Sequence, residues 1–336
     1  MASAGGIEYS NMANRAENAA VIGTGMMGPG IALTLALGGL RTAILSRRRD
    51  NAARALETAR SQALLLAGRD LIDAGRADEA AGLLTASTAF DEVVVGAGLV
   101  VESAPEDLPF KQELFARLDA LAAPEALLAS NTSGLSITAI AERCSRPERV
   151  LTAHFWNPPH LMPLVEIVMG AQTSDASAEK LRGVLVACGK TPVLVRKDRP
   201  GQLGNRLQMA LLREASHIIA EGIAGADDID MVIRDGLGLR MPGYGLLEHM
   251  DVVGLNMGLA ILEYVSRDLY SEPHAPEHIR DLVRRGDLGA STGMGFYDWS
   301  TKSADEVRAR RDAFLIEVLR YRRKKSGPFP FCTPRV

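Results

Sequence analysis

Two ionisable residues near the middle of the chain, a histidine and a glutamate, could act together in proton transfer. His154 lies in an apolar stretch at 150–155, and Glu166 lies in a second apolar stretch at 164–169 after a short loop. If the two stretches pair as antiparallel strands about His160, the side chains of His154 and Glu166 face each other. An unpaired carboxylate inside an apolar strand is costly, and a carboxylate partner orients an imidazole and raises its basicity. The pair therefore predicts a general acid/base, with a purely structural pair as the alternative.

A glycine-rich turn near the start of the chain predicts a dinucleotide site. Gly23, Gly25 and Gly28 form the pattern G-x-G-x-x-G, with Met26 and Met27 inside it, after an apolar stretch and before a helical pattern. In this context the first glycine makes a tight turn, the second admits a pyrophosphate, and the third lets helix and strand pack closely. The following helix N-terminus favours phosphate groups. A tight turn that binds no ligand is the alternative.

The end of the second expected strand indicates which nicotinamide cofactor binds. NAD-binding domains usually carry Asp or Glu there, about 20 residues after the glycines, to hold the ribose 2′-hydroxyl. Here Leu45 is followed by Ser46, Arg47 and Arg48. Arg47 can pair with a 2′-phosphate, and no acid is present to repel that group. We expect NADP(H) to be favoured and NAD(H) to be possible, the alternative being a solvated basic turn.

The spacing of apolar residues in the first 200 residues predicts the strands and helices that position these side chains. Candidate strands lie at 20–23, 42–46, 99–102, 127–130, 150–155, 164–169 and 192–196, and helical patterns lie at 28–38, 52–67, 108–121 and 176–189. Continuous apolar strands that alternate with helices favour a mostly parallel sheet covered on both faces. Asn131 and Ser133 follow one of these strands, at the sheet edge where ligands bind.

Beyond residue 200 only helical patterns recur. They lie at 203–222, 227–234, 255–269, 276–285 and 304–323, with Ser303 as the expected N-cap of the last. We expect a flexible leader at 1–18, a dinucleotide-binding domain at 19–200, a helical substrate and dimerisation domain at 201–325 and a tail at 326–336.

Composition excludes several classes of protein. Lys plus Arg is 38 and Asp plus Glu is 41, a net charge of −3, so a nucleic-acid partner is not expected and the basic run at 320–325 is a solvated helix end. The uncharged stretch at 19–40 contains six glycines and Pro29, so a membrane span is not expected. Three cysteines without a C-x-x-C pair, and a start without a secretory signal, favour a cytoplasmic protein without disulfides or metal.

These segments together resemble the L-3-hydroxyacyl-CoA dehydrogenase family, and in particular its branch of lambda-crystallin, L-gulonate dehydrogenase and carnitine dehydrogenase. The resemblance extends to residues 289–299, which are similar to the family pattern G-x-x-G-x-K-T-G-x-G-F-Y-D. It implies an α/β fold, namely a Rossmann-type doubly wound sheet with a C-terminal all-helical domain. It also implies a homodimer formed through the helical domain.

The resemblance implies a role for each candidate residue. His154 would exchange a proton with the substrate oxygen at C3, Glu166 would hold and polarise His154, Ser133 would hydrogen-bond that oxygen, and Asn205 would position the substrate carbonyl. The residues implied to contact the cofactor are Glu106, Lys111, Asn131, Ser133 and Asn157. For Lys111, an exposed lysine on a helix is the alternative.

Three departures from the family pattern widen the choice of substrate. Ser46 replaces the usual acid, Trp156 stands where a smaller or phenyl side chain is commoner, and the helical region at 52–73 is poor in lysine. We expect an NAD(P)-dependent oxidoreductase that interconverts a 3-hydroxyacyl and a 3-oxoacyl small molecule, either a CoA thioester or a free acid. The alternatives are reduction of a specialised ketone or sugar acid on the same fold, and a non-catalytic dinucleotide-binding protein.

Overall fold

The computed structural model describes residues 17–326, and these divide into two compact units. The first unit comprises residues 17–203 together with residues 310–326, and the second comprises Gly204–Ala309. The expected leader at 1–18 and tail at 326–336 lie almost wholly outside the described residues. The predicted domain boundary near residue 200 stays a prediction; the division between the units falls after Leu203.

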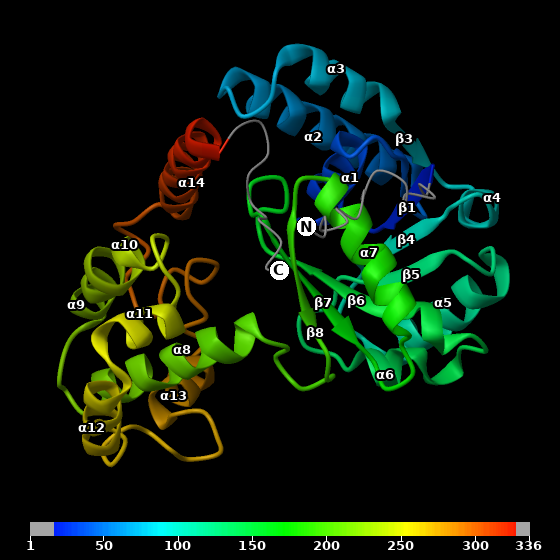
Figure 1. Ribbon diagram of the computed structural model, residues 1–336. Coiled ribbons are helices and arrows are strands. Elements are labelled where there is room, and N and C mark those ends of the chain that lie inside the picture. Colours follow the sequence, from blue (N-terminus) through cyan, green and yellow to red (C-terminus); the bar gives the residue numbers. More distant parts are fainter. Residues whose placement is uncertain (1–16, 327–336) are drawn as a thin grey trace, which may run out of the picture. The chain divides into compact units, whose positions relative to one another are not determined.

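An eight-stranded sheet forms the centre of the first unit (Figure 1). Its order is β3-β2-β1-β4-β5-β6-β7-β8, in which the first six strands are parallel and β7 and β8 run the opposite way. The strands are β1 (Asn18–Ile22), β2 (Arg41–Leu45), β3 (Leu84–Ser87), β4 (Leu99–Glu102), β5 (Leu127–Ser130), β6 (Val150–Phe155), β7 (Leu164–Met169) and β8 (Thr191–Val195). The strand order reverses direction between β1 and β4, which makes their carboxyl ends the place for a dinucleotide.

Helices cover both faces of this sheet, as predicted. One apolar cluster packs α1, α2, α3, α7 and residues 315–319 of α14 (Ala304–Ser326) against the strands, and a second packs α4, α5 and α6. The helices of this unit are α1 (Gly28–Leu37), α2 (Arg49–Gly68), α3 (Ala74–Leu83), α4 (Phe90–Val95), α5 (Leu108–Leu121), α6 (Ile137–Ile140) and α7 (Asp175–Ala187). In Figure 1, α2 and α3 lie side by side next to β3.

The uncharged stretch at 19–40 forms β1 and α1. Residues 28–36 of α1 are all buried, because the sheet lies on one side of the helix and α2 and α3 lie on the other. A helix packed on both sides is apolar all round. Among residues 17–326, no helix combines the length and the apolar character that crossing a membrane requires.

The second unit is helical, also as predicted. Its helices are α8 (Gly204–Ala220), α9 (Ala226–Met231), α10 (Gly238–Arg240), α11 (Leu246–Val253), α12 (Leu255–Val265), α13 (Glu277–Arg285) and the first turns of α14 (Ala304–Ser326), with a π-helical turn at Val232–Leu237. Ser303 accepts a hydrogen bond from the backbone N–H of Glu306 at 3.2 Å, which confirms it as the N-cap of α14.

Several short elements were not predicted. The missed elements are β3, α3, α4, α10 and α11, and the helix expected at 255–269 ends at Val265. The helix expected at 227–234 ends as α-helix at Met231 and continues as the π-helical turn. Short edge strands and short helices carry little periodicity, so sequence patterns detect them poorly.

Candidate cofactor and catalytic site

The glycine turn after β1 has the backbone that close approach to a ligand requires. Gly23 has φ +127°, and a Cβ there would lie 2.2 Å from the carbonyl oxygen of Ser103. A Cβ on Gly28 would lie 2.0 Å from the carbonyl oxygen of Gly23, so helix and turn pack without room for a side chain. A Cβ on Gly25 would meet nothing within 4 Å, which leaves open space beside the N-terminus of α1. This cradle fits a dinucleotide pyrophosphate.

The remaining turn residues lie at the surface beside this cradle. Met26 is 75% exposed, and Met27 is half-buried. At the end of β2, the hydroxyl of Ser46 accepts a hydrogen bond from the backbone N–H of Arg48 at 3.3 Å. Arg47 and Arg48 are exposed. No carboxylate side chain follows β2 directly, since the first acid is Asp50 in α2.

A buried ion pair between Glu102 and Lys111 supports the end of β4. The sequence identifies Lys111 as a candidate but not Glu102. Glu102 is fully buried, and its carboxylate accepts hydrogen bonds from the Lys111 ammonium at 2.5 Å and the Ser130 hydroxyl at 2.6 Å. Lys111 is 1% exposed, so its interpretation as an exposed helix lysine is wrong. Glu102 was predictable by the argument that identified Glu166, because it also lies in an apolar strand.

Glu106 connects this ion pair to the segment after β5. Its carboxylate accepts hydrogen bonds from the backbone N–H of Ser133 at 2.7 Å and from the hydroxyls of Ser133 and Thr132, and it lies 3.6 Å from Lys111. Burial raises the pKa of Glu106, but the hydrogen bonds from Ser133 and Thr132 and the charge of Lys111 outweigh it and bring the pKa below its usual range. The two candidate cofactor residues Glu106 and Ser133 therefore lie together.

Asn131 joins the carboxyl ends of three strands. Its backbone N–H donates to the carbonyl of Glu102 at 2.6 Å, its side-chain NH₂ donates to the Ser103 hydroxyl at 3.2 Å, and its side-chain oxygen accepts from the backbone N–H of Phe155 at 2.8 Å. The structure thus places Asn131 as a support between β4, β5 and β6. Phe155 is the residue next to His154.

His154 and Glu166 are paired in the predicted register. β6 and β7 are antiparallel with His154 opposite Glu166, and the His154 Nδ1 lies 2.9 Å from the Glu166 Oε2. His154 is 7% exposed and Glu166 is 1% exposed. Since Nδ1 is bonded to the carboxylate, Nε2 is the nitrogen left to exchange a proton with a substrate.

Two further donors hold the Glu166 carboxylate, and sequence reasoning missed both. The Trp156 indole N–H donates to Oε2 at 3.1 Å, and the backbone N–H of Leu203 donates to Oε1 at 3.0 Å. The rings of Trp156 and His154 lie 5.9 Å apart between centroids. The sequence identifies Trp156 only as a departure from the family pattern. No neighbouring residue in the sequence indicates that its partner is Glu166.

Asn157 and Asn205 are the last two candidates. Asn157 is exposed and precedes Pro158 through a cis peptide bond. Asn205 is the second residue of α8 in the second unit. Their proposed roles stay predictions.

Two protein-family models match the chain. Residues 18–199 match the NAD-binding domain of 3-hydroxyacyl-CoA dehydrogenase, and residues 201–299 match the C-terminal domain of 3-hydroxyacyl-CoA dehydrogenase. The two matches together cover most of the chain.

Individual relatives cover nearly the full chain. The chain is 32% identical to 5-formyl-3-hydroxy-2-methylpyridine 4-carboxylate 5-dehydrogenase of Mesorhizobium japonicum, over 90% of this chain and 97% of that one. It is 34% identical to a probable 3-hydroxybutyryl-CoA dehydrogenase of Bacillus subtilis, over 84% of this chain and 98% of that one.

Solved structures share the fold. The crystal structure of a 5-formyl-3-hydroxy-2-methylpyridine 4-carboxylic acid 5-dehydrogenase, described as an NAD⁺-dependent dismutase, superposes with a TM-score of 0.84 at 29% identity, over 91% of this chain and 98% of that one. A 3-hydroxybutyryl-CoA dehydrogenase from Escherichia coli gives 0.71 at 32% identity, over 86% of this chain and 61% of that one.

Proposed function

The chain belongs to the 3-hydroxyacyl-CoA dehydrogenase family, and we propose that it interconverts a 3-hydroxyacyl and a 3-oxoacyl compound with His154 as the acid/base. The observation that carries the proposal is the buried His154–Glu166 pair, 2.9 Å apart at the carboxyl end of β6. This end lies at the same sheet edge as the glycine turn after β1. Family membership makes the protein a nicotinamide-dependent oxidoreductase; the residue roles below are our proposal.

The glycine turn and the ends of β2 and β4 hold the cofactor in this proposal. Gly23, Gly25 and Gly28 admit the pyrophosphate, and the N-terminus of α1 stabilises its charge. A nicotinamide held there would supply hydride transfer to or from C3 of the substrate. Further contacts come from the residues near the opening of the cradle, namely Met26, Met27, Glu106, Lys111, Asn131, Ser133 and Asn157.

His154 moves the proton that accompanies this transfer. In oxidation its Nε2 takes the proton of the C3 hydroxyl, and in reduction it returns a proton to the C3 oxygen. Glu166 fixes the ring through Nδ1 and stabilises the imidazolium that forms. Ser133 hydrogen-bonds the C3 oxygen, and Asn205 positions the substrate carbonyl.

We propose that NADP(H) is preferred over NAD(H). The supporting observations are the exposed Arg47 and Arg48 after β2 and the hydroxyl of Ser46 where an acid would repel a 2′-phosphate. The test is the ratio of kcat/KM for NADPH to that for NADH. We expect Arg47→Ala to lower this ratio roughly 10- to 100-fold, the worth of hydrogen bonds to a charged group, while the exposed Arg60→Ala of α2 leaves it unchanged. A wild-type preference for NADH contradicts the proposal.

The substrate form is tested by a matrix of activities. 3-Hydroxybutyryl-CoA and free 3-hydroxybutyrate are each offered with NADP⁺ and NAD⁺, and the absorbance of the reduced nicotinamide is followed. Turnover of either compound supports the proposed reaction and identifies the thioester or the acid as substrate. Cofactor binding without turnover of any compound in the matrix contradicts it and favours a non-catalytic dinucleotide-binding protein.

A second candidate is oxidation of an aldehyde or hydroxymethyl group on an aromatic acid. It is favoured by the TM-score of 0.84 to the pyridine carboxylate dehydrogenase, against 0.71 for the 3-hydroxybutyryl-CoA dehydrogenase. The same His154–Glu166 pair serves that reaction. Turnover of 5-formyl-3-hydroxy-2-methylpyridine 4-carboxylate with no turnover of the 3-hydroxyacyl compounds selects it.

We further propose a cytoplasmic homodimer that associates through the second unit. Many large apolar side chains of α8, α11 and α12 are exposed there, among them Leu247 at 78% and Val252 at 81%. A patch of this kind marks an association surface. Sedimentation equilibrium should give twice the chain mass, and the double variant Leu247→Glu/Val252→Glu should give one chain mass.

For the proposed cytoplasmic location, the supporting observation is that the two described cysteines, Cys144 and Cys188, are not joined in a disulfide.

A further inference from the structure

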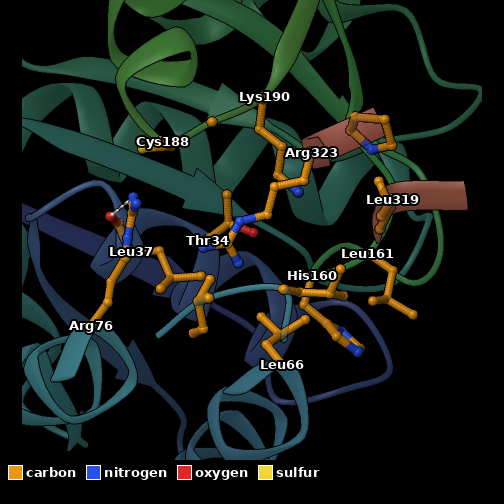
Figure 2. Close-up of a pocket in the computed structure, with 14 residues that line it drawn as sticks. Thr34, Leu37, Leu66, Arg76, His160, Leu161, Cys188, Lys190, Leu319 and Arg323 are labelled. Carbon is orange, nitrogen blue, oxygen red and sulfur yellow. Dashed lines mark hydrogen bonds between the residues drawn. The ribbon is translucent and has the colours of Figure 1, made fainter. Parts of the chain in front are cut away.

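A cavity separate from the catalytic pair lies inside the first unit (Figure 2). It has a volume of about 110 Å³, several times the roughly 10–15 Å³ that one water molecule needs. Its lining comes from α1, α2, α3, the loop between β6 and β7, the residues before β8 and the end of α14. Neither His154, Glu166 nor the glycine turn contributes to this lining.

The lining combines positive charge with apolar side chains. Its three basic residues are Arg76, Lys190 and Arg323, and within residues 17–326 no Asp or Glu lines it. Leucine, isoleucine and proline side chains form most of the remainder. In Figure 2, Lys190 and Arg323 lie in the upper part of the view and Leu66 lies in the lower part. A ligand with one anionic end and one apolar end matches this lining.

Lys190 is the strongest sign that an anion belongs in the cavity. It is 7% exposed, and its ammonium donates to the carbonyl oxygens of Pro159 at 2.5 Å and Met162 at 2.9 Å. Burial lowers the pKa of Lys190 to about 8, and among the described groups only the Cys188 thiol acts in the opposite direction. A buried cation without a carboxylate partner is costly, and a bound anion would compensate it.

His160 and Arg323 add two more polar side chains to the lining. The Nδ1 of His160 is buried and has no hydrogen-bond partner among the described residues. Arg323 donates to the backbone carbonyl of Asp70, while the Asp70 carboxylate pairs with Arg320. Burial lowers the pKa of Arg76; Asp73 and Glu79 act to raise it, and the charge of Arg323 acts to lower it, so the two cations act on each other.

We propose that this cavity binds a small carboxylate with a short apolar chain. The carboxylate lies toward Lys190 and Arg323, and the apolar chain lies against the leucine-lined part. The volume admits a molecule of several heavy atoms, so butyrate serves as the probe, sulfate as the anion without an apolar chain, and 1-butanol as the apolar chain without a charge.

The test measures butyrate binding to the full chain by calorimetry, without nicotinamide present. We expect Lys190→Met and Arg323→Gln each to weaken butyrate at least about tenfold, the worth of a hydrogen bond to a charged group. Lys324→Gln removes an exposed charge from the same helix and should leave the affinity unchanged. His154→Ala should also leave it unchanged, which separates this cavity from the catalytic site. Arg323 is only half-buried, so Arg323→Gln tests the proposal even if Lys190→Met does not fold.

The pH dependence of binding supplies an independent readout. Butyrate affinity should be constant below pH 8 and fall up to tenfold per pH unit above it, as Lys190 loses its proton. The pKa of His160, lowered by burial to about 4, and that of Cys188, raised by burial to about 12, place both titrations outside this window. The other charged groups near these side chains are Arg311 and Asp312, which act on His160, and Arg76 and Arg323, which line the cavity.

Four results would overturn the proposal. The first is that butyrate does not bind, and the second is that His154→Ala abolishes binding while Lys190→Met keeps it. The third is that 1-butanol binds as tightly as butyrate, and the fourth is that sulfate binds more tightly than butyrate.

Discussion

Trp156 gives the sharpest single perturbation of the proposed acid/base pair. Its indole N–H donates to the Oε2 of Glu166 at 3.1 Å, the same oxygen that lies 2.9 Å from the Nδ1 of His154. Trp156→Phe keeps an aromatic ring and removes this donor. The carboxylate then has one hydrogen bond fewer to fix the position in which it orients the His154 ring.

The size of the effect follows from the worth of the lost hydrogen bond. A neutral donor to an ionised acceptor contributes about 1.5 kcal/mol at the low end of its range, and about 1.4 kcal/mol of activation barrier corresponds to a tenfold change in rate. The Leu203 N–H still holds the other carboxylate oxygen and limits the change. We therefore expect kcat to fall by up to about tenfold.

The assay measures kcat and KM for reduction of a 3-oxoacyl compound. We expect kcat to fall in Trp156→Phe while KM stays unchanged, because the lost hydrogen bond fixes the acid/base pair and not the substrate. Trp299→Phe, which removes an indole of the second unit, serves as the control and should leave kcat unchanged. An unchanged kcat in Trp156→Phe, or an equal fall in Trp299→Phe, refutes the reasoning.

Two further predictions concern the support of the cofactor edge. Lys111→Met leaves the Glu102 carboxylate buried without a cation and should lower the free energy of unfolding by about 3–5 kcal/mol in urea titrations. The double variant Lys111→Met/Glu102→Gln should recover part of this loss. Equal stability of wild type and Lys111→Met would count against the ion pair. The lowered pKa of Glu106 means that its ionised form stabilises the fold above the ordinary pKa of 4.5 and that this contribution disappears as the pH falls through the lowered value. Wild type and Glu106→Gln should therefore differ in stability at pH 7 and converge as the pH falls through the lowered pKa, and a difference that grows on acidification would contradict this.

Some of the site was predictable because it depends on strand geometry alone. The pairing of His154 with Glu166 follows from two apolar stretches of equal length about one short loop, and antiparallel pairing then leaves few registers. The glycine turn was predictable because the close approach of Gly23, Gly28 and Ser103 admits no side chain. The same reasoning would have found Glu102.

Other parts depend on contacts that no local pattern encodes. The Trp156 indole reaches Glu166 because of the path of the loop between β6 and β7, and the Leu203 N–H reaches it from 37 residues further along the chain. Lys111 has the spacing of an ordinary helix lysine, and only the fold shows that β4 places a carboxylate in front of it. The cavity at Lys190 likewise forms from segments that are distant in sequence.

The central claim is that His154 moves the proton in a nicotinamide-dependent oxidation or reduction. Its most direct test is the rate at which His154→Ala reduces nicotinamide with 3-hydroxybutyryl-CoA or 3-hydroxybutyrate as substrate. The cofactor affinity of the same variant is measured in parallel by protein fluorescence. We predict a loss of about 10²- to 10⁴-fold in kcat, the usual worth of general acid–base catalysis, at unchanged cofactor affinity. Wild-type turnover by His154→Ala would contradict the account.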